Sequence, residues 1–162
     1  TYINTVLSKI MANLEFSLTL SSNPNELITH SMDYESYVNY LPDHIKNITI
    51  IEKTHEETIT EEVLEFHTII TKKIIQRSSH KKKDNILFTE IISGPFKNSK
   101  IEVKYDQHDS GTIITLIGNL EIPLKYKILS IAIKKMYKIV LRGILYKINN
   151  EIIKSKKETV LD

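Results

Sequence analysis

The last long apolar stretch of the chain, residues 123–153, restricts its possible folds more than any other segment. Apolar residues recur there at spacings of three and four, which is the pattern of one face of an α-helix. A helix over residues 124–152 would be roughly 40 Å long, at a rise of about 1.5 Å per residue. In a chain of 162 residues, a helix of that length must cross most of the molecule. The apolar residues of this face are Leu129, Ile133, Met136, Tyr137, Val140, Ile144 and Ile148.

Segments in which apolar and polar residues alternate precede this helix, and each predicts a β-strand with one buried face. The clearest is the first, where Leu14, Phe16, Leu18 and Leu20 alternate with polar residues. In residues 57–68 the apolar phase slips after Val63, which predicts a β-bulge. The other strands are expected at residues 45–54, 71–79, 86–93, 100–105 and 112–122, with turns at residues 80–85 and 106–111.

Two short helices are expected between the first and second strands. A serine and an asparagine that can cap a helix precede Pro24, which suits the first helical position, so the first helix should cover residues 24–32. The second should cover residues 33–41, with Asp33 as its cap and Pro42 as its stop.

The order of these elements defines an architecture. Short connections among the last six strands predict an antiparallel meander. One face of such a sheet needs cover, and the terminal helix is the only predicted element large enough to provide it. We therefore predict an α+β protein in which a curved, seven-stranded antiparallel sheet wraps around the long helix.

Composition indicates one domain, since 162 residues suffice to bury roughly two-thirds of the unfolded surface. No uncharged apolar run approaches the roughly 18 residues of a membrane span, and the start of the chain lacks the basic region of a signal peptide. The absence of cysteine excludes disulfides, a thiolate nucleophile and cysteine-based metal sites. We expect a cytoplasmic protein with a leader at residues 1–12, a single domain at residues 13–153 and a tail at residues 154–162.

Two short motifs add a family resemblance. Residues 37–42 read Tyr-Val-Asn-Tyr-Leu-Pro before the second strand, and residues 93–97 read Ser-Gly-Pro-Phe-Lys at the end of the fifth. With the order of the elements, residues 14–150 resemble the START-like helix-grip (SRPBCC) superfamily, in its coenzyme Q-binding and polyketide cyclase/dehydrase-like branch. The resemblance implies a hydrophobic cavity between sheet and helix that binds a lipid, an isoprenoid quinone or a polyketide-like molecule, with Tyr40 near its entrance.

The residues point to the same cavity independently. A curved sheet around one helix leaves space unless large side chains fill it, and the chain has no Trp and four Phe. Gly143, which costs about 1 kcal/mol in a helix interior, would mark a close approach to the sheet or to a ligand. The alternative is that the apolar helix is simply core, with or without a dimer contact. The predicted ligand-binding residues are Tyr40, Phe66, Phe88, Tyr105, Ile114, Leu116, Met136, Val140 and Ile144.

Catalysis would need an acidic or basic group that faces the cavity. Glu90 is the one weak candidate, because it shares a strand face with Phe88 and Ile92, although a phase error of one residue would place it in water. The chain has no catalytic triad, no Gly-rich phosphate loop and no histidine pair at metal-ligand spacing. We expect the six histidines at the surface, and no cofactor or metal.

A basic strand and turn make up the remaining feature. Such a region is usually a solvated sheet edge, but it could dock on anionic lipid heads or on ribosomal RNA. The net charge of +2 is too small to indicate DNA binding. Three functions remain open, a non-catalytic carrier of a hydrophobic small molecule, an aromatase/cyclase-type enzyme and a macromolecule-docking module, and we favour the carrier. The basic residues are Lys72, Lys73, Arg77, Lys81, Lys82 and Lys83.

Overall fold

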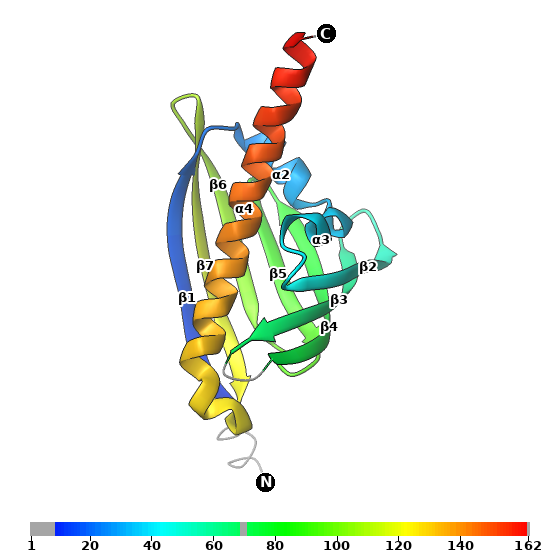
Figure 1. The fold of residues 1–162 in the computed structure, drawn as a ribbon, viewed down its shortest axis with the longest axis vertical. Coiled ribbons are helices and arrows are strands. Elements are labelled where there is room, and N and C mark those ends of the chain that lie inside the picture. Colours follow the sequence, from blue (N-terminus) through cyan, green and yellow to red (C-terminus); the bar gives the residue numbers. More distant parts are fainter. Residues whose placement is uncertain (1–8, 69–70, 162) are drawn as a thin grey trace.

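The computed structural model describes residues 9–68 and 71–161, in which an antiparallel sheet wraps around one long helix (Figure 1). The order across the sheet is β1-β7-β6-β5-β4-β3-β2, so the strands from β2 to β7 form a meander and β1 pairs with β7. The predicted α+β architecture with a seven-stranded antiparallel sheet is confirmed. The strands are β1 (Lys9–Leu20), β2 (Ile45–Lys53), β3 (Thr58–His67), β4 (Thr71–Lys83), β5 (Ile86–Ser93), β6 (Lys100–His108) and β7 (Gly111–Pro123).

Short helices carry the chain from β1, at one edge of the sheet, to β2 at the other. The first is α2 (Pro24–Ser31), whose N-cap Asn23 accepts a hydrogen bond of 2.9 Å from the backbone N–H of Glu26. The second expected helix divides into a 3₁₀ turn, η1 (Tyr34–Ser36), and the single α-helical turn α3 (Tyr37–Tyr40). A 3₁₀ segment, η2 (Leu124–Leu129), then leads into the long helix α4 (Ser130–Leu161).

Three boundaries differ from the sequence prediction. β1 begins at Lys9, so residues 9–12 belong to the sheet instead of a leader, because Ile10 and Ala12 continue its inward alternation; residues 1–8 lie outside the described part. α4 continues through the expected tail to Leu161, without Gly or Pro to stop it, and its last turns project beyond the sheet (Figure 1). β4 runs to Lys83, so residues 80–83 are strand and the turn begins at Asp84.

The predicted bulge in β3 is wrong. β3 pairs with β4 in continuous register from Thr58 opposite His80 to His67 opposite Thr71. The register shifts lie in β2 instead, where Lys46 and Ile51 are the extra residues in its pairing with β3. The phase of β3 does not slip; its inward face changes from polar residues to apolar ones. That change positions the site described below.

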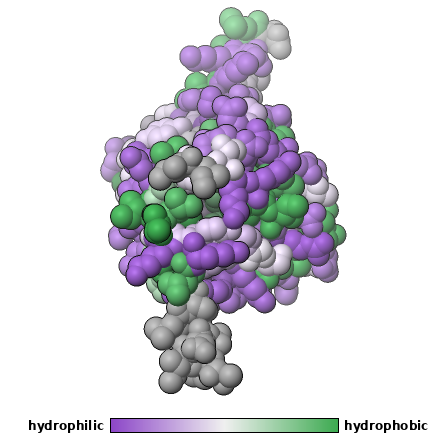
Figure 2. All heavy atoms as spheres, turned by 60° about the horizontal axis from the view of Figure 1, so that its bottom comes forward, coloured by the Kyte–Doolittle hydropathy of each residue, from purple (hydrophilic) through white to green (hydrophobic). Residues whose placement is uncertain are grey.

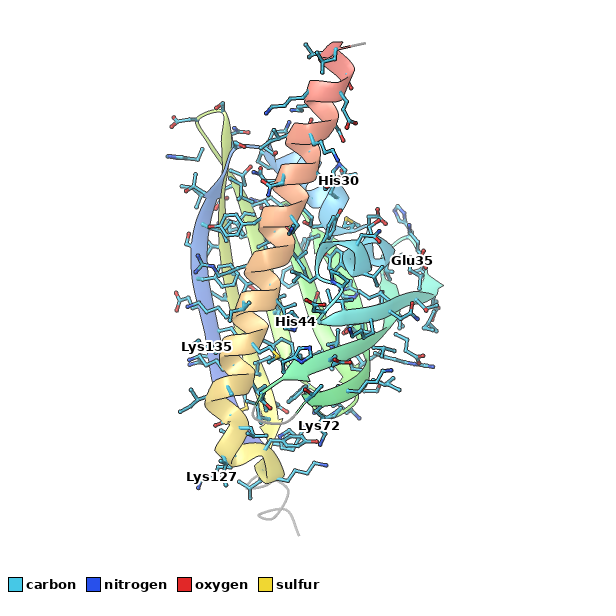
Figure 3. All side chains as sticks on the ribbon, viewed as in Figure 1. His30, Glu35, His44, Lys72, Lys127 and Lys135 are labelled. Carbon is cyan, nitrogen blue, oxygen red and sulfur yellow. The ribbon has the colours of Figure 1, made fainter. Side chains whose placement is uncertain are left out.

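Helix α4 lies across the concave face of the sheet and is buried on one side. The close neighbour of its Gly143 is the side chain of Leu41, after α3, and not the sheet as expected: a Cβ there would lie 3.2 Å from Leu41 Cδ1. The opposite side of η2 and α4 faces solvent with Ile128 and Ile131, beside the lysines at 127 and 135 (Figure 3).

At the lower end of the molecule, apolar side chains stand in small groups among hydrophilic ones (Figure 2). Within residues 9–68 and 71–161, no helix combines the length and the apolar character needed to cross a bilayer.

If α4 packs on the sheet as described, Ile148→Ala should lower the free energy of unfolding by about 2–5 kcal/mol, because it removes buried surface and leaves a void. Ile131→Ala on the same helix is the matched control, with an expected change below about 0.5 kcal/mol. Ile148 is 0% exposed and Ile131 is 82% exposed. Urea denaturation measures both, and equal losses would contradict this packing.

Candidate functional site

A cavity of about 150 Å³ lies between α4 and the middle of the sheet. Apolar residues of α4 and of strands β5, β6 and β7 form most of the wall. The segment from the end of α2 to α3 contributes Ser31, Tyr34 and Tyr37. Strands β3 and β4 contribute Glu62, Gln76, Ser78 and His80.

The predicted ligand-binding residues divide into two groups. Four of them line the cavity: Tyr105, Leu116, Val140 and Ile144. The other five do not. Ile114 and Met136 are buried in the core, Tyr40 is half-buried against it, Phe66 lines a separate space of about 20 Å³ and Phe88 lies on the other face of β5.

The inward phase of β5 is the reverse of the predicted one. Leu87, Thr89 and Ile91 line the cavity, so Phe88 and Glu90 point to the outer face of the sheet. Both faces of β5 carry apolar residues, and its sequence alternation therefore does not define which face is buried. Glu90 is consequently not placed to act on a molecule in the cavity.

Glu62 is the centre of the polar wall. Its carboxylate accepts hydrogen bonds from Gln76 Nε2 at 2.6 Å, Ser78 Oγ at 3.1 Å and Thr60 Oγ1 at 2.9 Å. All four side chains are buried. In the register of β3 and β4, Glu62 lies opposite Gln76 and Thr60 opposite Ser78, so the pairing itself assembles the cluster. A carboxylate away from water is costly unless such donors replace its hydration.

His80 extends this cluster and is buried, whereas a surface position was expected. Its Nε2 lies 2.9 Å from Thr60 Oγ1, and its Nδ1 lies 2.9 Å from Thr89 Oγ1. The single hydroxyl hydrogen of Thr60 is donated to Glu62, so Thr60 accepts the N–H of His80 Nε2. In a neutral imidazole, Nδ1 then accepts from Thr89. The ring of Tyr34 stacks on His80 with 4.0 Å between centroids and 19° between planes, which fixes the orientation of the imidazole.

Tyrosines supply the other polar atoms. Tyr105 donates to Ser31 Oγ at 2.9 Å, Tyr37 donates to the backbone carbonyl of Ser31, and Tyr137 donates to Gln76 Oε1 at 3.3 Å. Tyr137 thereby fixes the amide orientation that lets Gln76 donate to the carboxylate.

Burial keeps these phenols protonated. Desolvation raises the pKa of Tyr105 to about 12. It also raises the pKa of Tyr34, Tyr37 and Tyr137 above the usual range, and the negative charge of Glu62 adds to each of these three shifts. The tyrosines therefore remain neutral at physiological pH.

An aromatic cluster fills the interior beyond the cavity. Phe66 lies 5.9 Å from Phe96 and 5.2 Å from Tyr137, measured between ring centroids. The turn that carries Phe96 into the core needs Gly94, which has φ of +104° and leaves no room for a Cβ, since Gln76 Cβ would lie 2.9 Å away. The cavity is thus confined to the part of the interior beside the Glu62 cluster.

Two side chains of the predicted basic region contact other side chains of the protein. Arg77 pairs with Glu61 at 3.0 Å and Lys72 donates to the hydroxyl of Tyr126, while residues 81–83 are exposed. Docking of this region on a membrane or a ribosome stays a prediction.

Among the residues that the structure describes, no three metal-ligating side chains gather into a candidate metal site.

Sequence reasoning missed the polar wall, although a signal was present. Gln76, Ser78 and His80 continue the inward phase of Ile74, while four of the six basic residues of β4 fall in the alternate phase. The buried face of β4 is therefore polar over these three residues. The missed residues are Tyr34, Tyr37, Thr60, Glu62, Gln76, Ser78, His80, Thr89 and Tyr137.

The chain resembles known proteins in its structure but not in its sequence. No family model and no curated protein sequence matches the chain. Solved structures do match. The protein TTHA0849 from Thermus thermophilus is 14% identical with a TM-score of 0.76, covering 89% of this chain and 99% of that one. The Zhui aromatase/cyclase from Streptomyces sp. R1128 is 10% identical with a TM-score of 0.71 and respective coverages of 88% and 96%.

A START superfamily protein from Mycobacterium smegmatis is 12% identical with a TM-score of 0.68, covering 88% of this chain and 97% of that one. The chain has the helix-grip fold. Within that fold, the coenzyme Q-binding and polyketide cyclase/dehydrase-like branch stays a prediction. At these identities the likeness concerns backbone architecture, so the chemistry of the helix-grip cavity must be argued from this chain's own residues.

Loss of one hydroxyl from the hydrogen-bonded cluster around Glu62 should lower the stability of the fold markedly. Thr60→Val removes one hydroxyl with little change of shape and leaves both Glu62 and His80 short of a partner, so the free energy of unfolding should fall by about 2–3 kcal/mol. Thr19→Val is the control, because Thr19 is exposed on the outer face of β1, and its effect should stay within about 0.5 kcal/mol. Denaturant unfolding of the two variants checks this, and a neutral Thr60→Val would show that the cluster is not formed.

Proposed function

We propose that this protein binds a compact, largely apolar small molecule in the cavity between α4 and the sheet. The observation that carries the proposal is an apolar space with a hydrogen-bonded polar group, Glu62, on one wall. Ligand pockets have this character, with an apolar lining and a few fixed polar groups. Apolar burial would supply affinity and the polar wall would set orientation.

The volume of the cavity limits the size of the ligand that it can hold. Ligand pockets are usually about 300–1,000 Å³, whereas an engineered protein cavity of about 150 Å³ binds benzene. A space of about 150 Å³ therefore suits one ring with a small substituent better than a long-chain lipid or an isoprenoid quinone. Burying on the order of 150 Å² of such a ring gains roughly 4 kcal/mol, before the cost of association.

An aromatase/cyclase-type enzyme is the second candidate. Glu62 and His80, linked through the hydroxyl of Thr60, are a buried acid and base beside the cavity. Two matched structures are named as aromatase/cyclase proteins. We favour binding without catalysis, because both nitrogens of His80 already have partners within the protein. A cytoplasmic location accompanies this proposal and stays a prediction.

A cavity-filling substitution tests the proposal. Val140 lines the cavity, whereas its neighbour Ile139 is 56% exposed. Val140→Phe should place its ring in the cavity and weaken the binding of phenol at least about tenfold, a loss of roughly 1.4 kcal/mol. Ile139→Phe should bind phenol as the natural chain does. Isothermal titration calorimetry measures both affinities, and phenol binding that survives Val140→Phe would contradict the proposed location.

A further inference from the structure

We infer that the molecule held in this cavity carries a cationic amine, which Glu62 and the surrounding tyrosine rings recognise. The inference rests on the proposed function and adds the charge of the ligand. Among the described residues that line the cavity, Glu62 is the one carboxylate, His80 is the one basic side chain, and neither Lys nor Arg is present. No Lys or Arg of this lining offsets the charge of Glu62, and the nearest basic nitrogen, His80 Nε2, lies 3.7 Å from its carboxylate, so the lining favours a positive guest over a negative one.

The hydrogen bonds of Glu62 leave room for one more donor. A carboxylate offers about four lone-pair positions on its two oxygens. Oε2 accepts from both Gln76 and Ser78, whereas Oε1 accepts from Thr60. His80 Nε2 lies 3.7 Å from Oε1, which is beyond a hydrogen bond. An N–H of a ligand amine could take this position on Oε1, where a charge-assisted bond is roughly twice as strong as a neutral one.

Three tyrosine hydroxyls of the wall are already committed inside the protein. Tyr37 and Tyr105 donate to Ser31, and Tyr137 donates to Gln76. The three donors around Glu62 are directed at its carboxylate. Glu62 Oε1 therefore keeps acceptor capacity, which an N–H group of a ligand satisfies. An anionic ligand would meet the charge of Glu62 without a Lys or Arg to offset it.

Tyrosine rings in the cavity wall could also attract a cation through cation–π interactions. Four tyrosines line the cavity, and the faces of aromatic rings attract ammonium groups within about 6 Å of the ring centroid. Tyr34 uses one face to stack on His80. The groups that face His80 are Tyr34, Thr60, Thr89 and Glu62. These contacts hold the His80 ring in place beside Glu62.

Three probes with the same ring and different charge test this inference on the full chain: benzylamine, benzyl alcohol and benzoate. Isothermal titration calorimetry near neutral pH should show benzylamine binding about tenfold more tightly than benzyl alcohol, because its bond to Glu62 is charge-assisted, and benzoate binding least. Glu62→Gln keeps the shape of the side chain without its charge. This variant should lose most of the preference for the amine and still bind benzyl alcohol.

Glu61→Gln is the matched control, because Glu61 pairs with Arg77 on the outer face, and it should keep the preference for benzylamine. Benzyl alcohol or benzoate binding the natural chain as tightly as benzylamine would overturn the amine inference and leave the proposed function standing. Failure of all three probes to bind would overturn both. The comparison of probes on the natural chain decides the inference even if Glu62→Gln does not fold.

Discussion

The burial of one carboxylate, Glu62, is the constraint to which the interior is adapted. A charged group away from water is tolerated only where donors replace its hydration, and here three side chains from two neighbouring strands do so. Those donors occupy inward positions that aliphatic residues would otherwise fill. The pairing of β3 with β4 is continuous along this stretch, so the cluster is built into the sheet and does not depend on a loop.

The cavity follows from this arrangement of the core. Phe66, Phe96 and Tyr137 pack together in the core, and the rings of Tyr34 and Tyr37 contact each other on the cavity wall. Beside the polar side chains of β3 and β4, of which Gln76 meets Tyr137 of α4, about 150 Å³ stays open. The helix-grip fold supplies the enclosing sheet and helix, while the side chains of this chain decide where the space lies and what it can hold.

Sequence reasoning predicted the parts of the fold in which one physical pattern dominates. Leu14 to Leu20 in β1 alternate without exception, and the apolar stripe of α4 continues for several turns. The site was harder to predict, because β3 and β4 turn polar residues inward against the usual pattern, and β5 is apolar on both faces. Thr60, Glu62 and His80 were missed for the first reason, and Phe88 and Glu90 were assigned to the wrong face for the second.

The most direct test of this account is a crystal structure of the protein soaked with bromobenzene, with the bromine located by its anomalous scattering. The account predicts a bromine position enclosed by α4 and strands β3 to β7, in contact with Val140 and Leu116, with Glu62 still held by its three donors. An interior closed by side chains with no enclosed bromine, or a Glu62 side chain turned to solvent, would contradict it.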